Sequence, residues 1–390
     1  MSRTLEPLPL STGIRSRQVE GINGLSMHVL EAGFETPGRP CVLLLHGFPE
    51  LAFSWRKVMP ALAAAGYHVI APDQRGYGRT TGWSADYDTD LRPFSLLSIV
   101  RDALALVHAF GYRSVAAVVG HDFGSPIAAW CALTRPDVFR SVVLMSAPFG
   151  GPPALPFDPV NAAGAGSAPG FAAAVGRILG DLAALPQPRK HYQWYYSTRV
   201  ANVDMLGCPQ GLHAFLRAYY HVKSADRAAN QPHPLAGFTA QELAKLPTYY
   251  VMDLDKTMAE TVAPEMPSAQ AIAANTWLPD ADLAVYSGEY GRTGFQGGLQ
   301  WYRGQSGDMF VPDLQLFAGR SIDVPSMFVS GRSDWGNYQK PGDLEAMGAR
   351  ACSRFEGGHF VDGAGHWVQQ EQPQAVIGHL TAFLRRHAPV

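Results

Sequence analysis

The chain has 390 residues, of which 47% are hydrophobic and 16% are charged, and its formal net charge is −2. This composition predicts a folded protein with a large buried core, and it excludes a disordered or collagen-like chain. A nearly neutral chain has no basic field to hold a phosphate backbone, so we expect no nucleic-acid partner. The longest apolar runs have the length of strands, so we expect no membrane span.

The N-terminus and the cysteines indicate a cytoplasmic protein. The opening residues, MSRTLEPLPL, contain no apolar segment typical of a secretory signal. The four cysteines are widely scattered, with no CxxC pair and no spacing typical of metal ligands. We therefore expect reduced thiols and no bound metal.

From Cys41 onward, short apolar runs alternate with stretches that have helical spacing. The clearest helix lies at 95–110, where leucine and valine side chains recur every three or four residues. Continuous apolar runs are typical of parallel strands that are buried on both faces. The runs predicted as strands lie at 41–47, 68–73, 113–122 and 140–149. Strands alternating with helices predict an α/β fold with a mostly parallel, doubly wound sheet.

The alternation stops after Phe149 and resumes only near the end of the chain. A tract of small residues comes first, and a region rich in Tyr, Trp, Pro and Gly then runs to about Gln315. Strand-like segments return at 324–334 and 352–361, and an amphipathic helix at 373–386 closes the chain.

These breaks predict a core that is divided by an insertion. We expect residues 1–150 and 318–390 to form one core, with a mainly helical lid at 151–317 inserted between its two parts. In an open α/β sheet the ligand crevice lies beyond the carboxyl ends of the strands. Reactive side chains at those ends are therefore the candidates for a site.

One strand end carries an aspartate within a tight turn. Gly120 and Gly124 stand two positions before and after Asp122, which is the spacing of a nucleophile elbow that forces the middle side chain into the crevice. A carboxylate is already charged at neutral pH, so it could attack a saturated carbon without a base and form an ester that water then hydrolyses. The alternative is that Asp122 caps the helix that begins near Ser125.

The loop after the first of these strands, His46–Glu50, could complete the reactive turn. A backbone N–H from this loop, together with the one after the nucleophile, would form an oxyanion hole. We assign these donors to the amides of Phe48 and Phe123. Pro49 has no N–H and would make the loop rigid, and the sequence leaves open whether the bond before it is cis. The alternative is an ordinary tight turn.

A histidine and a second carboxylate are candidates for the rest of a triad. His366 lies in a glycine-rich loop just before the last helix, from which a general base could reach the elbow. Asp334 stands at the carboxyl end of its predicted strand and could hold the imidazole in the required tautomer.

Other histidines and aspartates fit these roles less well. His121 adjoins the nucleophile and should point away from it, and His359 is a further rival. Asp362 lies in the loop of the histidine itself and could brace it. Asp323 precedes its strand and so stands at the wrong end of the sheet.

Five motifs follow one another along the chain: HGFPE, DQRGYG, GHDFGS, SGRSDW and GAGHWVQQEQP. With these motifs, and with the chain order of nucleophile, acid and histidine, the sequence resembles the epoxide hydrolases of the α/β-hydrolase fold. The resemblance covers the core almost from end to end. It implies an enzyme that converts an epoxide and water to a vicinal diol, with no cofactor and no metal.

The resemblance also assigns two tyrosines of the lid. In these enzymes two lid tyrosines bind and protonate the epoxide oxygen, in surroundings that look like YQ-x-Y and NWYR. The segments HYQWYY and GGLQWYRG supply Tyr192 and Tyr302, although Gln300 stands where the family usually has asparagine. Tyrosine is a credible acid for so basic a product as an alkoxide. Without the family pattern we would interpret both as packing residues.

The lid is longer than the minimal version in this family, and its effect on the substrate is open. SGEYGRTGFQGG precedes the second tyrosine and the small-residue tract precedes the first. These additions could be surface loops or pocket walls. Trp55, Trp194 and Trp301 could line an apolar pocket, but core packing explains them equally well. We expect a small, mainly apolar epoxide as substrate, and a homodimer is one expectation for the assembly.

Two other functions compete with this interpretation. Haloalkane dehalogenases use the same aspartyl ester, but they typically look like HGNP and DWG, with asparagine and tryptophan N–H groups that hold the halide. Here Phe48 and Phe123 occupy those positions, and neither side chain can donate a hydrogen bond. A binding protein that has lost turnover is the other alternative, and the full set of reactive residues argues against it.

Overall fold

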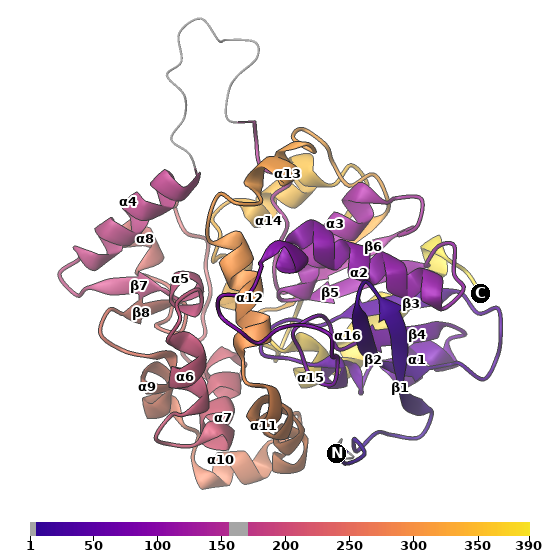
Figure 1. Ribbon diagram of the computed structural model, residues 1–390, viewed down its shortest axis with the longest axis horizontal. Helices are drawn as coiled ribbons and strands as arrows, with labels where there is room; N and C mark the ends of the chain where they lie inside the picture. Colours follow the sequence, from indigo (N-terminus) through magenta and orange to yellow (C-terminus); the bar gives the residue numbers. More distant parts are fainter. Residues whose placement is uncertain (1–4, 156–170) are drawn as a thin grey trace, which may run out of the picture.

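The structure is a computed structural model that describes residues 5–155 and 171–390. Most of the small-residue tract of the lid, at 161–170, lies outside the described residues. Figure 1 shows a central sheet with helices on both faces, and beside it a second part that is built mainly of helices. We call this second part the cap.

An eight-stranded sheet forms the centre of the molecule, in the order β1-β2-β4-β3-β5-β6-β9-β10. The pairs β1–β2 and β2–β4 are antiparallel, and the pairs that follow them across the sheet are parallel. The predicted mostly parallel, doubly wound sheet is therefore confirmed. The strands are β1 Ile14–Ile22, β2 Leu25–Ala32, β3 Cys41–Leu45, β4 His68–Pro72, β5 Ala117–His121, β6 Val142–Met145, β9 Ser326–Gly331 and β10 Phe355–Val361.

The hairpin of β1 and β2 was not expected from the sequence. It turns at Asn23 and Gly24, whose φ angles of 48° and 84° both lie in the left-handed region. An Asn-Gly pair between two strand-like segments is a strong hairpin signal, so the sequence does contain the information. The hairpin adds an antiparallel edge to the sheet and leaves β3 and β5 in its middle.

Helices cover both faces of the sheet, and alternate strand residues enter two separate cores. Leu43 and Leu45 of β3 belong to the core beneath α2 and α3, whereas Val42 and Leu44 belong to the core beneath α1 and α16. The helix predicted at 95–110 is found as α2. The helices of this part are α1 Met59–Ala64, α2 Leu96–Ala109, α3 Gly124–Thr134, α14 Asp343–Ala346, α15 Val368–Glu371 and α16 Pro373–His387.

Between β6 and β9 the chain forms the cap, so an inserted, mainly helical lid is confirmed. The short strands β7 Arg189–His191 and β8 Val251–Asp253 pair antiparallel within it. Its helices are α4 Phe171–Ala183, α5 Tyr192–Tyr196, α6 Ala201–Leu206, α7 Leu212–Lys223, α8 Ala240–Leu243, α9 Met258–Val262, α10 Ala269–Ala274, α11 Asp280–Thr293, α12 Gln296–Gln305 and α13 Val311–Gln315.

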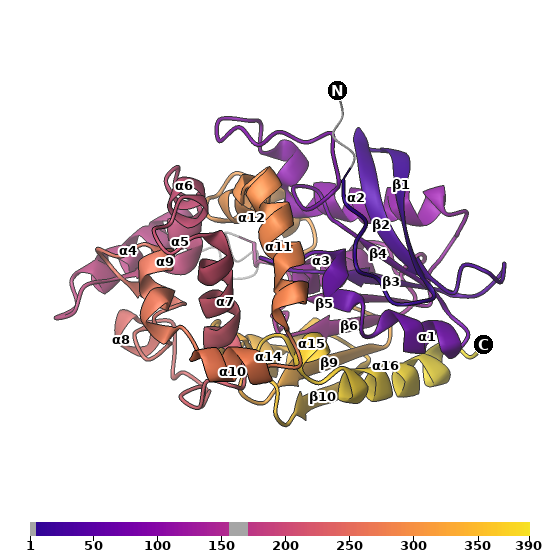
Figure 2. The same ribbon diagram turned by 90° about the horizontal axis from the view of Figure 1, so that it is seen from below.

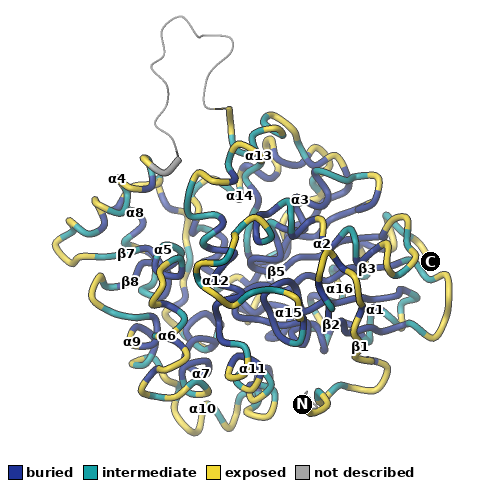
Figure 3. Tube along the Cα trace, in the orientation of Figure 1, coloured by how far each residue is buried: buried dark blue, intermediate teal, exposed yellow. Residues whose placement is uncertain are grey.

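The cap and the sheet share one hydrophobic core. In Figure 2, α7, α11 and α12 lie between the outer cap helices and the sheet. Buried positions run from the sheet into these inner cap segments, whereas an outer helix such as α10 is largely exposed (Figure 3). In the described part of the chain, no helix is long and apolar enough to cross a membrane.

Candidate active site

The turn between β5 and α3 holds Asp122 with a φ of 52°, in the left-handed region that residues other than glycine rarely adopt. A Cβ on Gly120 would lie 2.0 Å from the carbonyl oxygen of Gly124, and a Cβ on Gly124 would lie 2.3 Å from that of Leu45. A side chain would therefore not fit at either glycine position, and the two glycines permit the turn. The N-cap of α3 is Phe123, and no side chain caps this helix. Asp122 thus does not take the capping role that was its alternative.

The two oxygens of the Asp122 carboxylate face different groups. Oδ1 accepts a hydrogen bond of 2.8 Å from the amide of Phe48, and Oδ2 lies 3.1 Å from Nε2 of His366. Gly47 permits this close approach, because a Cβ there would lie 2.3 Å from Oδ1. The peptide bond between Phe48 and Pro49 is cis. The carboxylate is therefore held between a backbone donor and an imidazole.

The other amide that we assigned to an oxyanion hole belongs to Phe123. It follows Asp122 directly, at the start of α3. Among the described residues this amide has no hydrogen-bond acceptor. Phe48 and Phe123 thus present one amide that is bonded to the carboxylate and one that is free beside it.

His366 lies between two carboxylates. Its Nδ1 is 3.1 Å from each oxygen of Asp334, on the side opposite to Asp122. Asp334 follows β9 and also accepts the amide of Gly336 at 2.7 Å and the hydroxyl of Ser330 at 3.2 Å. All three members of the predicted triad are thus in hydrogen-bond contact in a row, and Asp334 is fixed by two further donors.

Hydrogen bonds from both parts of the molecule hold the backbone of His366. Its amide donates to the carbonyl oxygen of Lys223, at the end of α7, at 2.8 Å. Its carbonyl oxygen accepts the hydroxyl of Ser146 at 3.1 Å and lies 2.6 Å from Nε2 of His121. Nδ1 of His121 in turn lies 2.6 Å from Glu50. His121 therefore supports the backbone of His366 and does not take its place.

The loop of His366 is joined to the cap at a second point. One carboxylate oxygen of Glu371 accepts the amide of Gly365 at 2.9 Å and the amide of Ala225, just after α7, at 2.8 Å. The other rival side chains lie elsewhere. His359 stacks on His379, and Asp362 pairs with Arg332 at the surface. Asp323 accepts hydrogen bonds from Ser321 and Ser353.

The charges in this row keep the carboxylates ionised and favour a protonated imidazole. Burial alone would raise the pKa of Asp122, but the hydrogen bond and charge of His366 hold it well below its usual range. The pKa of Asp334 is lowered in the same way against its burial. Burial alone would lower the pKa of His366, but Asp334 and Asp122 together raise it to about 9. In the free protein the imidazole thus carries a proton between two anions.

The predicted tyrosines come from two short cap helices, Tyr192 from α5 and Tyr302 from α12. Their ring centroids are 6.1 Å apart, and the ring of Tyr302 packs edge-on against Phe48 and Phe123 at 5.5 Å and 5.0 Å. Burial raises the pKa of both phenols well above the usual value, and the charge of Asp122 adds to it. Both therefore stay protonated as hydrogen-bond donors beside the loop and turn that hold Asp122.

The two phenols differ in their partners. The hydroxyl of Tyr192 donates to Gln339 at 3.1 Å and accepts from Gln193 at 3.2 Å. The hydroxyl of Tyr302 has no hydrogen bond to any described residue. Tyr302 is thus free to bind an oxygen at once, whereas Tyr192 must exchange a partner. The contact with Gln339 was not expected, because this residue belongs to the core and follows β9.

The three tryptophans that could have lined a pocket are placed differently from one another. Trp301 is fully buried, donates from Nε1 to the carbonyl oxygen of Arg75 at 2.9 Å, and packs behind Phe123 at 5.1 Å. Trp194 packs against His191 at 4.7 Å. Trp55 is fully buried in the core beneath α1 and α16, on the other face of the sheet. Trp55 is therefore a packing residue, because the core that contains it does not include the aromatic residues around Asp122.

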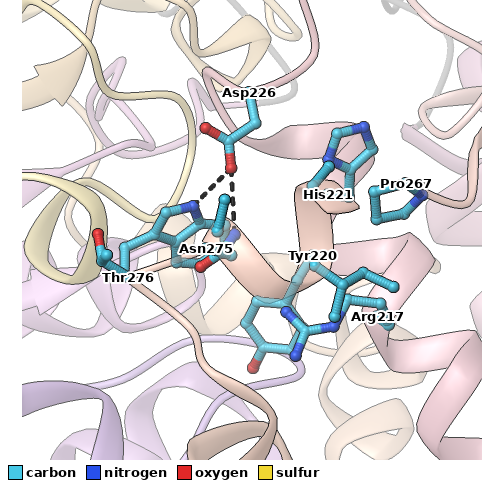
Figure 4. Close-up of a pocket in the computed structure, with 11 residues that line it drawn as sticks. Arg217, Tyr220, His221, Asp226, Pro267, Asn275 and Thr276 are labelled. Carbon is cyan, nitrogen blue, oxygen red and sulfur yellow. Dashed lines mark hydrogen bonds between the residues drawn. The ribbon is translucent and has the colours of Figure 1, made fainter. Parts of the chain in front are cut away.

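A separate pocket of about 300 Å³ lies in the cap, apart from the residues described above. Figure 4 shows Asp226 at its edge, where the carboxylate accepts Nε1 of Trp277 at 2.7 Å and Nδ2 of Asn275 at 3.2 Å. Arg217 and His221 of α7 also line it. Within residues 5–155 and 171–390, no cluster of three or more His, Cys, Asp or Glu side chains could hold a metal ion.

Known proteins with similar sequences share this architecture. The sequence profile of the alpha/beta hydrolase fold family matches residues 40–373. Epoxide hydrolase A of Mycobacterium tuberculosis is 31% identical over 377 residues, which cover 95% of this chain and 98% of the relative. An epoxide hydrolase of Caballeronia sordidicola is 30% identical, with 93% of this chain and 92% of the relative covered.

Two solved structures are similar over almost the whole chain. An epoxide hydrolase from an endophytic Streptomyces superposes with a TM-score of 0.73 at 32% identity, covering 96% of both chains. Epoxide hydrolase A from Mycobacterium thermoresistibile superposes with a TM-score of 0.72 at 29% identity, covering 95% of this chain and 98% of its own.

Proposed function

Because the chain belongs to the α/β-hydrolase family, and within it to the epoxide hydrolases, we propose that it adds water to an epoxide through a covalent ester on Asp122. The product is a vicinal diol. The observation that carries the proposal is the position of the Asp122 carboxylate between the Phe48 amide and His366, where its charge also acts on two protonated phenols of the cap. A carboxylate in this position can attack carbon, and the phenols can supply the proton that the opened ring requires.

In the first step, an oxygen of Asp122 attacks one epoxide carbon, and the bond between that carbon and the ring oxygen breaks. The ring oxygen leaves as an alkoxide and takes a proton from Tyr302 or Tyr192. The resulting phenolate recovers a proton from His366, which is protonated in the free protein because its pKa is about 9. The step ends with a neutral hydroxyalkyl ester, two neutral phenols and a neutral imidazole.

In the second step, His366 takes a proton from water, and the hydroxide attacks the ester carbonyl of Asp122. The amides of Phe48 and Phe123 hold the oxyanion that forms. The Phe48 amide already donates to Oδ1 of Asp122, and the Phe123 amide has no other acceptor among the described residues, so both can donate to this oxygen. When this intermediate collapses, the bond between its carbon and the alkoxy oxygen breaks, and the proton of its hydroxyl group passes to that oxygen to complete the diol. The carboxylate returns beside the protonated imidazole. Asp334 holds the imidazole in the tautomer with Nε2 directed to the water.

Each of these steps uses a carboxylate, an imidazole, phenols, amides and water, so the proposal needs no cofactor and no metal. The positions that hold the halide in a dehalogenase are occupied by Phe48 and Phe123, whose rings donate no hydrogen bond. The aromatic rings around Tyr302 favour a small, mainly apolar epoxide as substrate.

Three further features stay proposals. We propose that the core comprises 1–150 and 318–390 and the cap 151–317, which agrees with the last strand before the cap, β6, and the first one after it, β9. We propose a cytoplasmic location, and the four cysteines, all buried and unpaired, fit a reducing compartment. We propose a homodimer as the assembly, for which light scattering is the test.

A single turnover in oxygen-18 water tests the ester. The attacking oxygen of the first turnover comes from Asp122, so the first diol should be unlabelled and the label should appear in Asp122 by mass spectrometry of its peptide. Asp122→Asn is the control and should take up no label and form no diol. Label in the diol of the first turnover would mean that water attacks the epoxide directly.

A further inference from the structure

Lys223, the last residue of α7, is a cation in the interior of the molecule. Only 3% of it is exposed, and within the described part of the chain it forms no ion pair and no side-chain hydrogen bond. Lysine is almost never fully buried without a partner. The mechanism above makes no use of this side chain.

Aromatic rings surround the ammonium group of Lys223. Its Nζ lies 4.8 Å from the ring centroid of Tyr250 and 5.1 Å from that of Tyr219, and the rings of Tyr192, Tyr249 and Trp367 lie within 5.9 Å. Ring faces attract a desolvated cation, so this cage can hold the charge without a carboxylate. The cage includes Tyr192 of the site and Trp367, the residue after His366.

The backbone places the same residue next to the general base. The carbonyl oxygen of Lys223 accepts the amide of His366 at 2.8 Å, which fixes the end of α7 to the loop of the histidine. The charge of Lys223 also acts on the triad, where it lowers the pKa of both Asp122 and His366. Lys223 is therefore a fixed positive charge within electrostatic reach of the proton that moves in the reaction.

We propose that Lys223 is a positioning residue. When Asp122 becomes a neutral ester, the ammonium group of Lys223 balances the negative charge of Asp334, and so keeps His366 unprotonated for the attack on water. This inference rests on the proposed function. In the free protein, Asp122 and Asp334 balance the protonated His366 and Lys223. After the ester forms, Asp334 and Lys223 balance each other only if His366 has lost its proton. Without Lys223, the neutral arrangement would be Asp334 with a protonated His366, which cannot act as a base.

Three other ionisable groups lie against the backbone around His366. His121 and Glu50 form a buried pair at its carbonyl oxygen, and Glu371 accepts the amide of the preceding residue. None of them is the group that loses its charge when the ester forms. Burial raises the pKa of Glu371 to about 7, so this carboxyl titrates within the pH range of the test in the wild type and in the variant alike. Facing Lys223, three phenols of the cage stay neutral, because burial raises the pKa of Tyr192, Tyr249 and Tyr250 well above the usual value.

Single-turnover kinetics from pH 6 to pH 9, with excess enzyme and styrene oxide, separate the two steps. In Lys223→Met, the rate of ester hydrolysis should fall at low pH. The acid limb of its pH–rate profile should move up by about one pH unit, which is the shift expected for a unit charge within about 10 Å at an effective dielectric constant near 20. Ester formation should change by less than about twofold, because Asp122 is already ionised and His366 already protonated when that step begins. Lys223→Arg should restore the limb, because arginine keeps the charge. Lys190→Met, which removes a lysine from the ring of Tyr195, is the matched control and should leave the limb in place.

Titration of His366 by NMR gives a second measurement that does not depend on turnover. Asp122→Asn imitates the neutral ester, and in that background Lys223→Met should raise the pKa of His366 by about one unit. An unchanged titration and an unmoved acid limb would overturn the inference and leave Lys223 a packing residue. A loss that is confined to the KM of carboxylate-bearing epoxides would overturn it in favour of substrate recognition. If the wild type forms no ester at all, the proposed function fails, whatever Lys223 does.

Discussion

The core and the cap contribute to the site in different ways. The core supplies Asp122, Asp334 and His366 from turns in which backbone contacts leave no freedom, such as the left-handed residue between Gly120 and Gly124. The cap supplies phenols from short helices, and those side chains contact mostly other aromatic rings. The groups that form and break the covalent bond are thus fixed by the backbone, and the groups that exchange protons with the epoxide oxygen are fixed by packing.

This difference predicts that core substitutions stop the reaction at a defined step, whereas cap substitutions weaken it more gradually. Asp334→Asn gives the largest expected effect. Because the amide favours the wrong tautomer of His366, we expect ester hydrolysis to slow by on the order of a thousandfold while ester formation changes much less. Rapid quench should then show the ester accumulating on Asp122.

Asp362→Asn is the control for this change. Asp362 lies in the loop of His366, but its carboxylate pairs with Arg332 at the surface. It should leave both steps intact. Equal slowing of both steps in Asp334→Asn would mean that another acid orients the histidine.

On the cap side, Tyr302→Phe and Tyr192→Phe should each slow ester formation by about a hundredfold, because one proton donor is lost in each. We expect the larger effect from Tyr302, since its hydroxyl has no competing partner whereas that of Tyr192 is bonded to Gln339. Substrate consumption in a single turnover measures this step.

Tyr195→Phe is the matched control on α5. The hydroxyl of Tyr195 donates to Asp204, so its removal should not affect the chemistry. If both Tyr302→Phe and Tyr192→Phe kept wild-type rates of ester formation, the cap phenols would be packing residues only.

A third substitution changes the core backbone without removing a reactive group. Gly47→Ala would place a Cβ 2.3 Å from Oδ1 of Asp122, so the loop and the elbow must separate. We expect ester formation to slow by about tenfold and the free energy of unfolding to fall by about 1–3 kcal/mol. Urea unfolding and single-turnover rates measure both quantities, and a wild-type rate would show that the contact with Phe48 does not control the attack.

The smallest effect concerns pH. The pKa of His366 is raised from 6.5 to about 9, so its ion pairs stabilise the fold fully below pH 6.5 and are lost as the pH rises through 9. The free energy of unfolding should fall across this window by at most about 3 kcal/mol. His366→Gln should remove this part of the slope, and equal slopes in urea unfolding of the two proteins would contradict the raised pKa.

The core was largely predictable from the sequence because its signals are local. Buried strands read as continuous apolar runs, and the glycine spacing around Asp122 specifies the turn within five residues. The hairpin at Asn23 was missed although its turn signal is present. The positions of the cap tyrosines followed from the family pattern and not from the physical chemistry of the residues.

Residues that depend on long-range contacts could not be predicted. Lys223 reads as the end of an ordinary amphipathic helix, and only the packing of α7 against three other segments encloses it in aromatic rings. Gln339 and Glu50 likewise have no local signature, because each acts on a side chain that is far away in sequence. The effect of such residues depends on how deeply they are buried and on which residues they contact. Both are set only when the chain folds.

The two links between the loop of His366 and the end of α7 have a consequence for how the product leaves. The carbonyl oxygen of Lys223 holds the amide of His366, and Glu371 joins Gly365 to Ala225. Lifting the cap as a rigid body would pull the imidazole out of line with both carboxylates on every cycle. We therefore expect the diol to escape through local movements of cap side chains, while the seam between α7 and the histidine loop stays closed.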